Sequence, residues 1–239
     1  MSLYEKAWQA VGARVAAAAR AAGRDPGSVR VLAVSKTVPI EPIRAAHALG
    51  QRAFGENYVQ EAIGKIATLS VLDGIEWHLI GPLQSNKARA AATNFSWVQS
   101  VDRLPIAERL AAARGKELPP LNICVQVNIS GESGKSGCAP DAALDLAQGV
   151  AQQQGLALRG FMGIAEETAD VDRQRAQFRT LRVLFDRARA SGLPVDTLSM
   201  GMSADMEAAI AEGSTLVRIG SALFGARPGK TTERHESAA

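Results

Sequence analysis

The sequence is poor in cysteine and histidine, which narrows the chemistry open to it. It contains two cysteines and three histidines among 239 residues. Cys124 lies in an apolar run and Cys138 in a Gly/Ser-rich segment, too few for a disulfide framework or a metal cluster, so we expect free thiols. His47, His78 and His235 lie far apart in the sequence, without acidic partners at metal-ligand spacing. We therefore expect no bound metal.

Long hydrophobic runs and a large surplus of one charge are also lacking. The apolar stretches have the length of strands, well short of the roughly 20 residues of a membrane span. The net charge of +3, from 27 basic and 24 acidic residues, is too small for a nucleic-acid-binding surface. The Ala/Arg-rich start is interrupted by Glu5 and Asp25, which favours an amphipathic first helix over a transit peptide. We expect a cytoplasmic protein with a small-molecule partner, without membrane or nucleic-acid contact.

The sequence does contain a regular alternation of short apolar runs and longer Ala-rich segments with helical spacing. Such an alternation predicts parallel βα units. A doubly wound open sheet is the alternative, but it usually has about five or six strands, and no G-x-G-x-x-G follows the first run. We predict a single (β/α)8 TIM barrel over residues 1–226, with a helix before the first strand and a flexible tail at 227–239. The predicted strands are 29–35, 52–55, 77–80, 97–101, 122–129, 157–163, 195–200 and 216–220, and the predicted helices are 3–22, 40–49, 56–69, 84–92, 103–114, 140–153, 170–190 and 204–212.

Reactive groups of a parallel barrel gather at the carboxyl ends of its strands, where Lys36 follows the first strand. At the poorly hydrated barrel mouth the charged amine is disfavoured, so we expect a lowered pKa for Lys36. A neutral amine attacks aldehydes. A lysine that reaches from the strand end into solvent is an equal alternative on position alone.

The loops after the last two strands have the composition of an anion site. Met202 and Ser203 precede a helix expected to begin near Ala204, and Gly220 and Ser221 follow the last strand. Free backbone N–H groups and hydroxyls at these two loops favour a phosphate site over simple helix capping by Ser203.

Arg218 lies within the last strand, where a charge is costly unless it is paired or directed at a ligand. Either an inward-pointing arginine or an ion pair with a barrel carboxylate satisfies this requirement. With Lys36 and the phosphate loops, an inward Arg218 would match the aldehyde, phosphate and pyridine nitrogen of pyridoxal 5′-phosphate (PLP).

Five segments resemble, in order, those of the pyridoxal phosphate homeostasis proteins (the YggS-type family), whose fold is similar to the N-terminal barrel of alanine racemase. They cover nearly the whole chain: VLAVSKT at 31–37, FGENYVQE at 54–61, WHLIGPLQSNK at 77–87, SGESGKSGC at 130–138 and LSMGMSADMEAAIAEGSTLVRIGSALFGAR at 198–227. The chain departs from the family in having Ser221 where Thr is frequent and Ala204 where Asp is frequent.

The resemblance implies a role for each candidate residue. Lys36 would hold PLP as a Schiff base, and Arg218 would face the pyridine nitrogen. Ser203, Ser221 and the Gly220 N–H would hold the phosphate beside Met202. Asn57 and His78 would line the same pocket, although a buried structural histidine is an equal reading of His78.

The segment NISGESGKSG invites a nucleotide-binding reading that its spacing excludes. A P-loop ending in Gly-Lys-Ser needs glycine at position 129, where the chain has Ile129. Lys135 is then a solvated loop lysine or a contact to an anionic ligand.

Three functions share the lysine and the phosphate site. A carrier in cellular PLP (vitamin B6) homeostasis, exchanging the cofactor with apo-enzymes or free amino acids, is favoured over a PLP-dependent amino-acid racemase. A racemase needs a base on each face of the substrate, and the only tyrosines are Tyr4 and Tyr58. The additional β domain of the related racemases is not found after the last strand, which also favours a monomer. A lysine-dependent aldolase acting on a phosphorylated sugar is the third possibility.

Overall fold

Eight strands close into a parallel barrel in the computed structural model, which describes residues 3–132 and 134–225. The strands pair in chain order, and β8 returns to β1 with Arg30 opposite Leu216 and Ala33 opposite Ile219. The predicted (β/α)8 barrel is confirmed, and the predicted strand ends differ from those in the structure by two residues at most. The strands are β1 Arg30–Val34, β2 Ala53–Glu56, β3 Glu76–Leu79, β4 Trp97–Val101, β5 Leu121–Val127, β6 Leu156–Gly163, β7 Thr197–Ser199 and β8 Leu216–Ile219.

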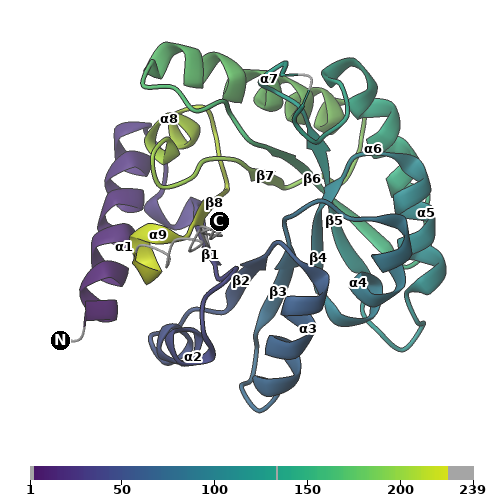
Figure 1. The fold of residues 1–239 in the computed structure, drawn as a ribbon. Helices are drawn as coiled ribbons and strands as arrows, with labels where there is room; N and C mark the ends of the chain where they lie inside the picture. Colours follow the sequence, from purple (N-terminus) through teal and green to yellow (C-terminus); the bar gives the residue numbers. More distant parts are fainter. Residues whose placement is uncertain (1–2, 133, 226–239) are drawn as a thin grey trace, which may run out of the picture.

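The helices surround the barrel (Figure 1). They are α1 Leu3–Ala21, α2 Ile40–Ala48, α3 Val59–Thr68, α4 Ala88–Asn94, α5 Leu104–Ala113, α6 Ala143–Ala151, α7 Val171–Ala190, α8 Met206–Ala211 and α9 Ser221–Phe224. Short 3-10 turns lie at Pro26–Ser28, Ser85–Lys87 and Pro140–Ala142. The last two occupy the starts of the helices predicted at 84–92 and 140–153.

Three predicted boundaries were wrong or incomplete at the carboxyl ends of strands. The helix predicted from residue 56 begins at Val59, because Glu56 pairs with Leu79 as the last residue of β2. The helix predicted from residue 204 begins at Met206. The short helix α9, which begins at Ser221, was not predicted.

Helix α1 completes the ring of helices, since the helix that follows β8 has only four residues. Val11, Val15 and Ala19 recur at one-turn spacing on α1 and are buried. Trp8 packs edge-on against Phe224 of α9, with 6.5 Å between ring centroids. Figure 1 shows α1 (purple) beside α8 and α9 (yellow-green), so the first and last described segments close the fold together. The tail predicted at 227–239 lies outside the described residues.

The barrel interior contains buried polar groups beside small apolar clusters, within an apolar shell. The largest apolar cluster unites residues of the strands and the surrounding helices, including Phe54, Phe161 and Phe178. Gln99 of β4 and Ser199 of β7 are fully buried and hydrogen-bonded to each other, although their strands are not neighbours. A bond between non-adjacent strands must cross the inside of the barrel, so polar groups fill part of its centre.

Candidate functional site

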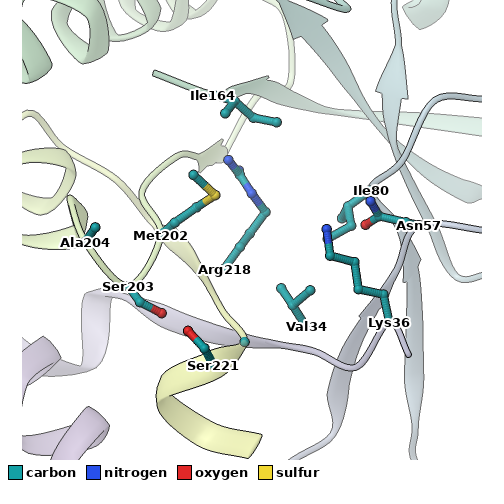
Figure 2. Close-up of a pocket in the computed structure, with 11 residues that line it drawn as sticks. Val34, Lys36, Asn57, Ile80, Ile164, Met202, Ser203, Ala204, Arg218 and Ser221 are labelled. Carbon is teal, nitrogen blue, oxygen red and sulfur yellow. The ribbon is translucent and has the colours of Figure 1, made fainter. Parts of the chain in front are cut away.

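A cavity of about 300 Å³ opens where the strands end, as Figure 2 shows. Residues that follow β1, β2, β3, β6, β7 and β8 contribute to it. Seven of the eight predicted binding residues lie at this cavity, and His78 does not. The lining residues are Val34, Lys36, Asn57, Ile80, Ile164, Met202, Ser203, Ala204, Arg218, Gly220 and Ser221.

Two opposite walls of the cavity carry its polar groups. We call Lys36 and Asn57, which follow β1 and β2, the lysine wall. Ser203, Gly220 and Ser221, which follow β7 and β8, form the serine wall. In Figure 2 the Lys36 amine points into the space between the walls, and the hydroxyls of Ser203 and Ser221 point toward each other. This arrangement offers an amine on one side and two hydroxyl donors on the other.

The serine wall differs in detail from the predicted cradle. Ser203 lies in a turn ahead of α8 rather than at its cap, because the side chain of Asp205 accepts a hydrogen bond from the Met202 N–H at 2.5 Å. Gly201 enables this turn with a φ of 94°, in the left-handed region that favours glycine. Ser203 is half-buried and Ser221 is exposed, so both hydroxyls are accessible to a ligand.

Asp205 is the acidic group nearest in chain to the serine wall, and the sequence interpretation missed it. Its burial raises the pKa of the carboxyl, while the bond from Met202 and the charge of Arg218 oppose the rise.

Arg218 points along the inside of the barrel into the cavity and is only 4% exposed. Its two terminal nitrogens donate to the carbonyl and hydroxyl of Ser199, at 2.7 and 2.8 Å, and to the Gly163 carbonyl at 2.8 Å. Burial lowers the pKa of Arg218 to about 10, which leaves it a cation at neutral pH. Three oxygens of uncharged groups therefore fix a buried positive charge at the cavity.

His78 belongs to a hydrogen-bonded chain beneath the cavity. The Ser199 hydroxyl donates to Gln99 at 2.6 Å, and the Gln99 amide lies 2.9 Å from Nδ1 of His78. The His78 ring is fully buried and stacks on Trp97, with 5.0 Å between centroids. Burial lowers the pKa of His78. The structure thus places His78 in the barrel interior rather than at the cavity. Gln99 and Ser199 link it to Arg218 through hydrogen bonds.

The lysine wall is supported from behind by a buried ionic cluster that the sequence interpretation also missed. Glu56 is fully buried, accepts from Ser35 at 2.5 Å, and lies 3.0 Å from the Lys65 amine. Lys65 also contacts Glu61 at 2.7 Å. Burial raises the pKa of Glu56, and the contacts with Ser35 and Lys65 oppose the rise. Glu61 and Lys65 stand four residues apart in a helix, a spacing that could have revealed their pairing.

A second cavity of about 190 Å³ shares Asn57, Ile80 and Ile164 with the first. Lys135 lies at this second cavity, and its amine is paired with Glu132. Lys135 is therefore neither a plain solvated lysine nor a member of the main cavity.

Other chemistries find little support in the part of the chain that the structure describes. No group of three or more His, Cys, Asp or Glu side chains there could hold a metal ion. No helix among those residues is both long and apolar enough to cross a membrane. Cys124 and Cys138 are unpaired, and burial raises the pKa of their thiols to about 12 and about 11. Neither thiol is a ready nucleophile at neutral pH.

Comparison with known proteins gives close relatives. The family model of the alanine racemase N-terminal domain matches residues 8–228. A pyridoxal phosphate homeostasis protein of Pseudomonas aeruginosa is 58% identical over 218 residues, covering 91% of this chain and 93% of the relative. The structure of PipY from Synechococcus elongatus PCC7942 with PLP bound is 40% identical, with a TM-score of 0.77, and the match covers 88% of this chain and all of PipY. An alanine racemase of Clostridium difficile 630 shares the fold at 13% identity, with a TM-score of 0.68, over 85% of this chain and 54% of the racemase.

Proposed function

The chain belongs to the family of pyridoxal phosphate homeostasis proteins, and from that premise we propose that it binds PLP in the main cavity and serves intracellular PLP homeostasis. The observation that carries the proposal is the convergence of Lys36, Arg218 and two serine hydroxyls on one cavity. PLP brings an aldehyde, a phosphate and a pyridine ring, and its aldehyde reacts reversibly with amines.

Each polar group of the cavity suits one part of the cofactor. Lys36 would hold the aldehyde carbon as a Schiff base, since its amine borders the cavity. Ser203, Ser221 and the Gly220 N–H bind the phosphate, and Arg218 faces the pyridine nitrogen. Asn57 borders the ring from the lysine wall. The apolar lining residues Val34, Ile80, Ile164 and Met202 suit the ring of the cofactor.

Storage and delivery suit this cavity better than racemisation. A racemase needs a proton-transferring base on each face of the reacting carbon. Among the described lining residues Lys36 is the one side chain able to act as such a base, since Arg218 stays protonated. Tyr58 is 61% exposed and lies outside the cavity. The cavity therefore holds the cofactor without equipping it for rapid two-base turnover.

The setting of this activity follows from the same features. We infer a cytoplasmic protein, because Cys124 and Cys138 are free thiols of the kind that reducing compartments maintain. We infer that it acts as a monomer, because the lining residues of a single chain already include an amine, an arginine and two hydroxyls. Apo-enzymes and free amino acids are the expected recipients of the released cofactor.

The test is the absorption spectrum of the PLP-loaded protein beside that of Lys36→Ala. Wild type is expected to show the lysine imine band at about 420 nm, and the variant to lose it while remaining folded. Lys116→Ala, which removes an exposed lysine outside the cavity, is the matched control and should keep the band. Borohydride reduction followed by peptide mapping should mark Lys36, and a map without that modification would overturn the proposal.

Carrier and racemase are separated by chiral chromatography. We expect no prompt interconversion of alanine enantiomers by the loaded protein. Interconversion that Lys36→Ala abolishes would assign a racemase instead.

A further inference from the structure

Lys36 occupies the second position of a tight turn. The Val38 N–H donates to the Ser35 carbonyl at 2.9 Å, which closes the turn over Lys36 and Thr37. The Ser35 N–H donates to the Gly55 carbonyl at 2.9 Å and ties the start of the turn to β2. The direction of the Lys36 side chain is therefore set by the backbone of this turn.

Thr37 gives the turn an unfavourable backbone conformation. Its φ is 60°, and it is the one non-glycine residue with positive φ among the described residues. A β-branched side chain disfavours this region, which such turns usually fill with glycine or asparagine. A conformation of this kind persists only where surrounding contacts hold it, and it often marks a functional site.

Lys65 supplies the contacts that hold the turn. Its amine, on a side chain 9% exposed, donates to the Ser35 carbonyl at 2.7 Å. It also bonds Glu56, which accepts from the Ser35 hydroxyl, and Glu61, which accepts from the Thr37 N–H at 2.6 Å. One buried cation thus organises the fixed groups on both sides of Lys36.

We propose that Lys65 is a positioning residue for Lys36: through Glu56, Glu61 and the Ser35 carbonyl it holds the Ser35–Val38 turn so that the Lys36 amine points into the cavity. The proposal rests on the proposed PLP binding. Attack by the Lys36 amine on the cofactor aldehyde forms a C=N bond and releases water, and it requires the amine to lie along the line of approach. A released turn would leave the phosphate site intact and misdirect the amine.

The test compares two ligands that differ only in the group that Lys36 attacks. Pyridoxine 5′-phosphate has the ring and phosphate of PLP, with an alcohol in place of the aldehyde. In Lys65→Met, which removes the charge at similar length, we expect the PLP dissociation constant to rise about tenfold or more, equivalent to about 1.4 kcal/mol. The dissociation constant of pyridoxine 5′-phosphate should stay within about twofold, and the imine band should form more slowly.

The control weakens another ionic cluster of the chain, in which a buried carboxylate bonds two exposed arginines. Glu212 is 9% exposed and bonds Arg175 and Arg179 at 2.7 and 2.9 Å. Glu212→Gln should lower the urea midpoint and leave both dissociation constants unchanged. Should Lys65→Met fail to fold, Glu61→Gln gives the milder test, because it loosens the Thr37 contact and keeps the Glu56–Lys65 pair.

A double variant tests the link to the strained turn. Glycine accepts positive φ without steric cost, so in Thr37→Gly the turn should depend less on the contacts that Lys65 supplies. Lys65→Met should then weaken PLP binding less in the Thr37→Gly background than in wild type. Equal losses in both backgrounds, equal weakening of the two ligands, or unchanged PLP binding in Lys65→Met would each overturn the proposal. A wild-type protein without the imine band would instead contradict PLP binding itself.

Discussion

The lysine wall and the serine wall face each other across one cavity and are held in opposite ways. Behind the lysine wall, Glu56 is fully buried and Lys65 nearly so, and both bond directly to Ser35, which precedes Lys36. The serine wall is exposed or half-buried, and the Ser203 carbonyl accepts from Arg14, itself exposed, at 3.2 Å.

The difference follows from what each wall would do with PLP. The proposed covalent bond requires an amine fixed in direction, which the buried contacts behind the lysine wall would provide. A phosphate has several equivalent oxygens and accepts donors from many directions, so accessible hydroxyls suffice on the serine wall. Changes to the buried contacts behind the lysine wall should therefore cost stability, and changes on the serine wall should cost affinity.

The largest effect is expected from Glu56→Ala, behind the lysine wall. Removing this carboxylate leaves the Lys65 cation buried with fewer partners, which should lower the free energy of unfolding by about 3 kcal/mol. Urea unfolding of the cofactor-free protein measures the loss. Ser221→Ala on the serine wall should change stability by about 0.5 kcal/mol or less. Equal losses in the two variants would remove the contrast between the walls.

Gly81→Ala should also damage the lysine wall. A Cβ at position 81 would lie 2.3 Å from the Asn57 carbonyl oxygen, so the Asn57 backbone must move. We expect a loss of about 2 kcal/mol of stability, again by urea unfolding. Gly64→Ala in α3 is the matched control: its Cβ meets nothing within 4 Å, and the change should be neutral or stabilising. An unchanged free energy of unfolding in Gly81→Ala would show that the Asn57 backbone moves at little cost.

Ser203→Ala should act on affinity alone. Loss of one hydrogen bond to a charged phosphate is expected to cost about 1.5 kcal/mol, or about tenfold in the PLP dissociation constant. Pyridoxal, which lacks the phosphate, should bind the variant and wild type equally, and the urea midpoint should not move. A higher pyridoxal dissociation constant for Ser203→Ala than for wild type would mean that Ser203 acts on more than the phosphate.

The smallest effect is expected below the cavity, at His78. Burial lowers the pKa of His78 from 6.5, so the unfolded chain takes up the proton at higher pH than the folded protein does. The stability this residue supports is thus complete above pH 6.5 and is lost as the pH falls below it. His78→Asn should give a flatter stability curve between pH 6.5 and about 5, where the unfolded Glu76 carboxyl is still largely ionised. Parallel curves for the two proteins would contradict the burial of an uncharged His78.

The sequence predicted the barrel because the signal for each element is local. Apolar runs of strand length and helical spacing recur in order, and each of the eight strands lies within two residues of its predicted place. Lys36, Asn57 and Arg218 could be placed at or near strand ends, and the rule for parallel barrels brings those ends to one face. The start of the helix near residue 204 was less predictable, because a turn in which the Asp205 side chain accepts from the Met202 N–H precedes α8.

The chain alone therefore determined the periodic pattern, the fold and most residues of the cavity, because periodicity and strand ends are encoded by neighbours in sequence. Only the tertiary structure decided which polar groups meet. His78 lies inside the barrel because Gln99 and Ser199 accommodate it there, and Lys65 reaches the Ser35 carbonyl from 30 residues away. Such contacts depend on how separate strands and helices pack together, and no local pattern of residues specifies them.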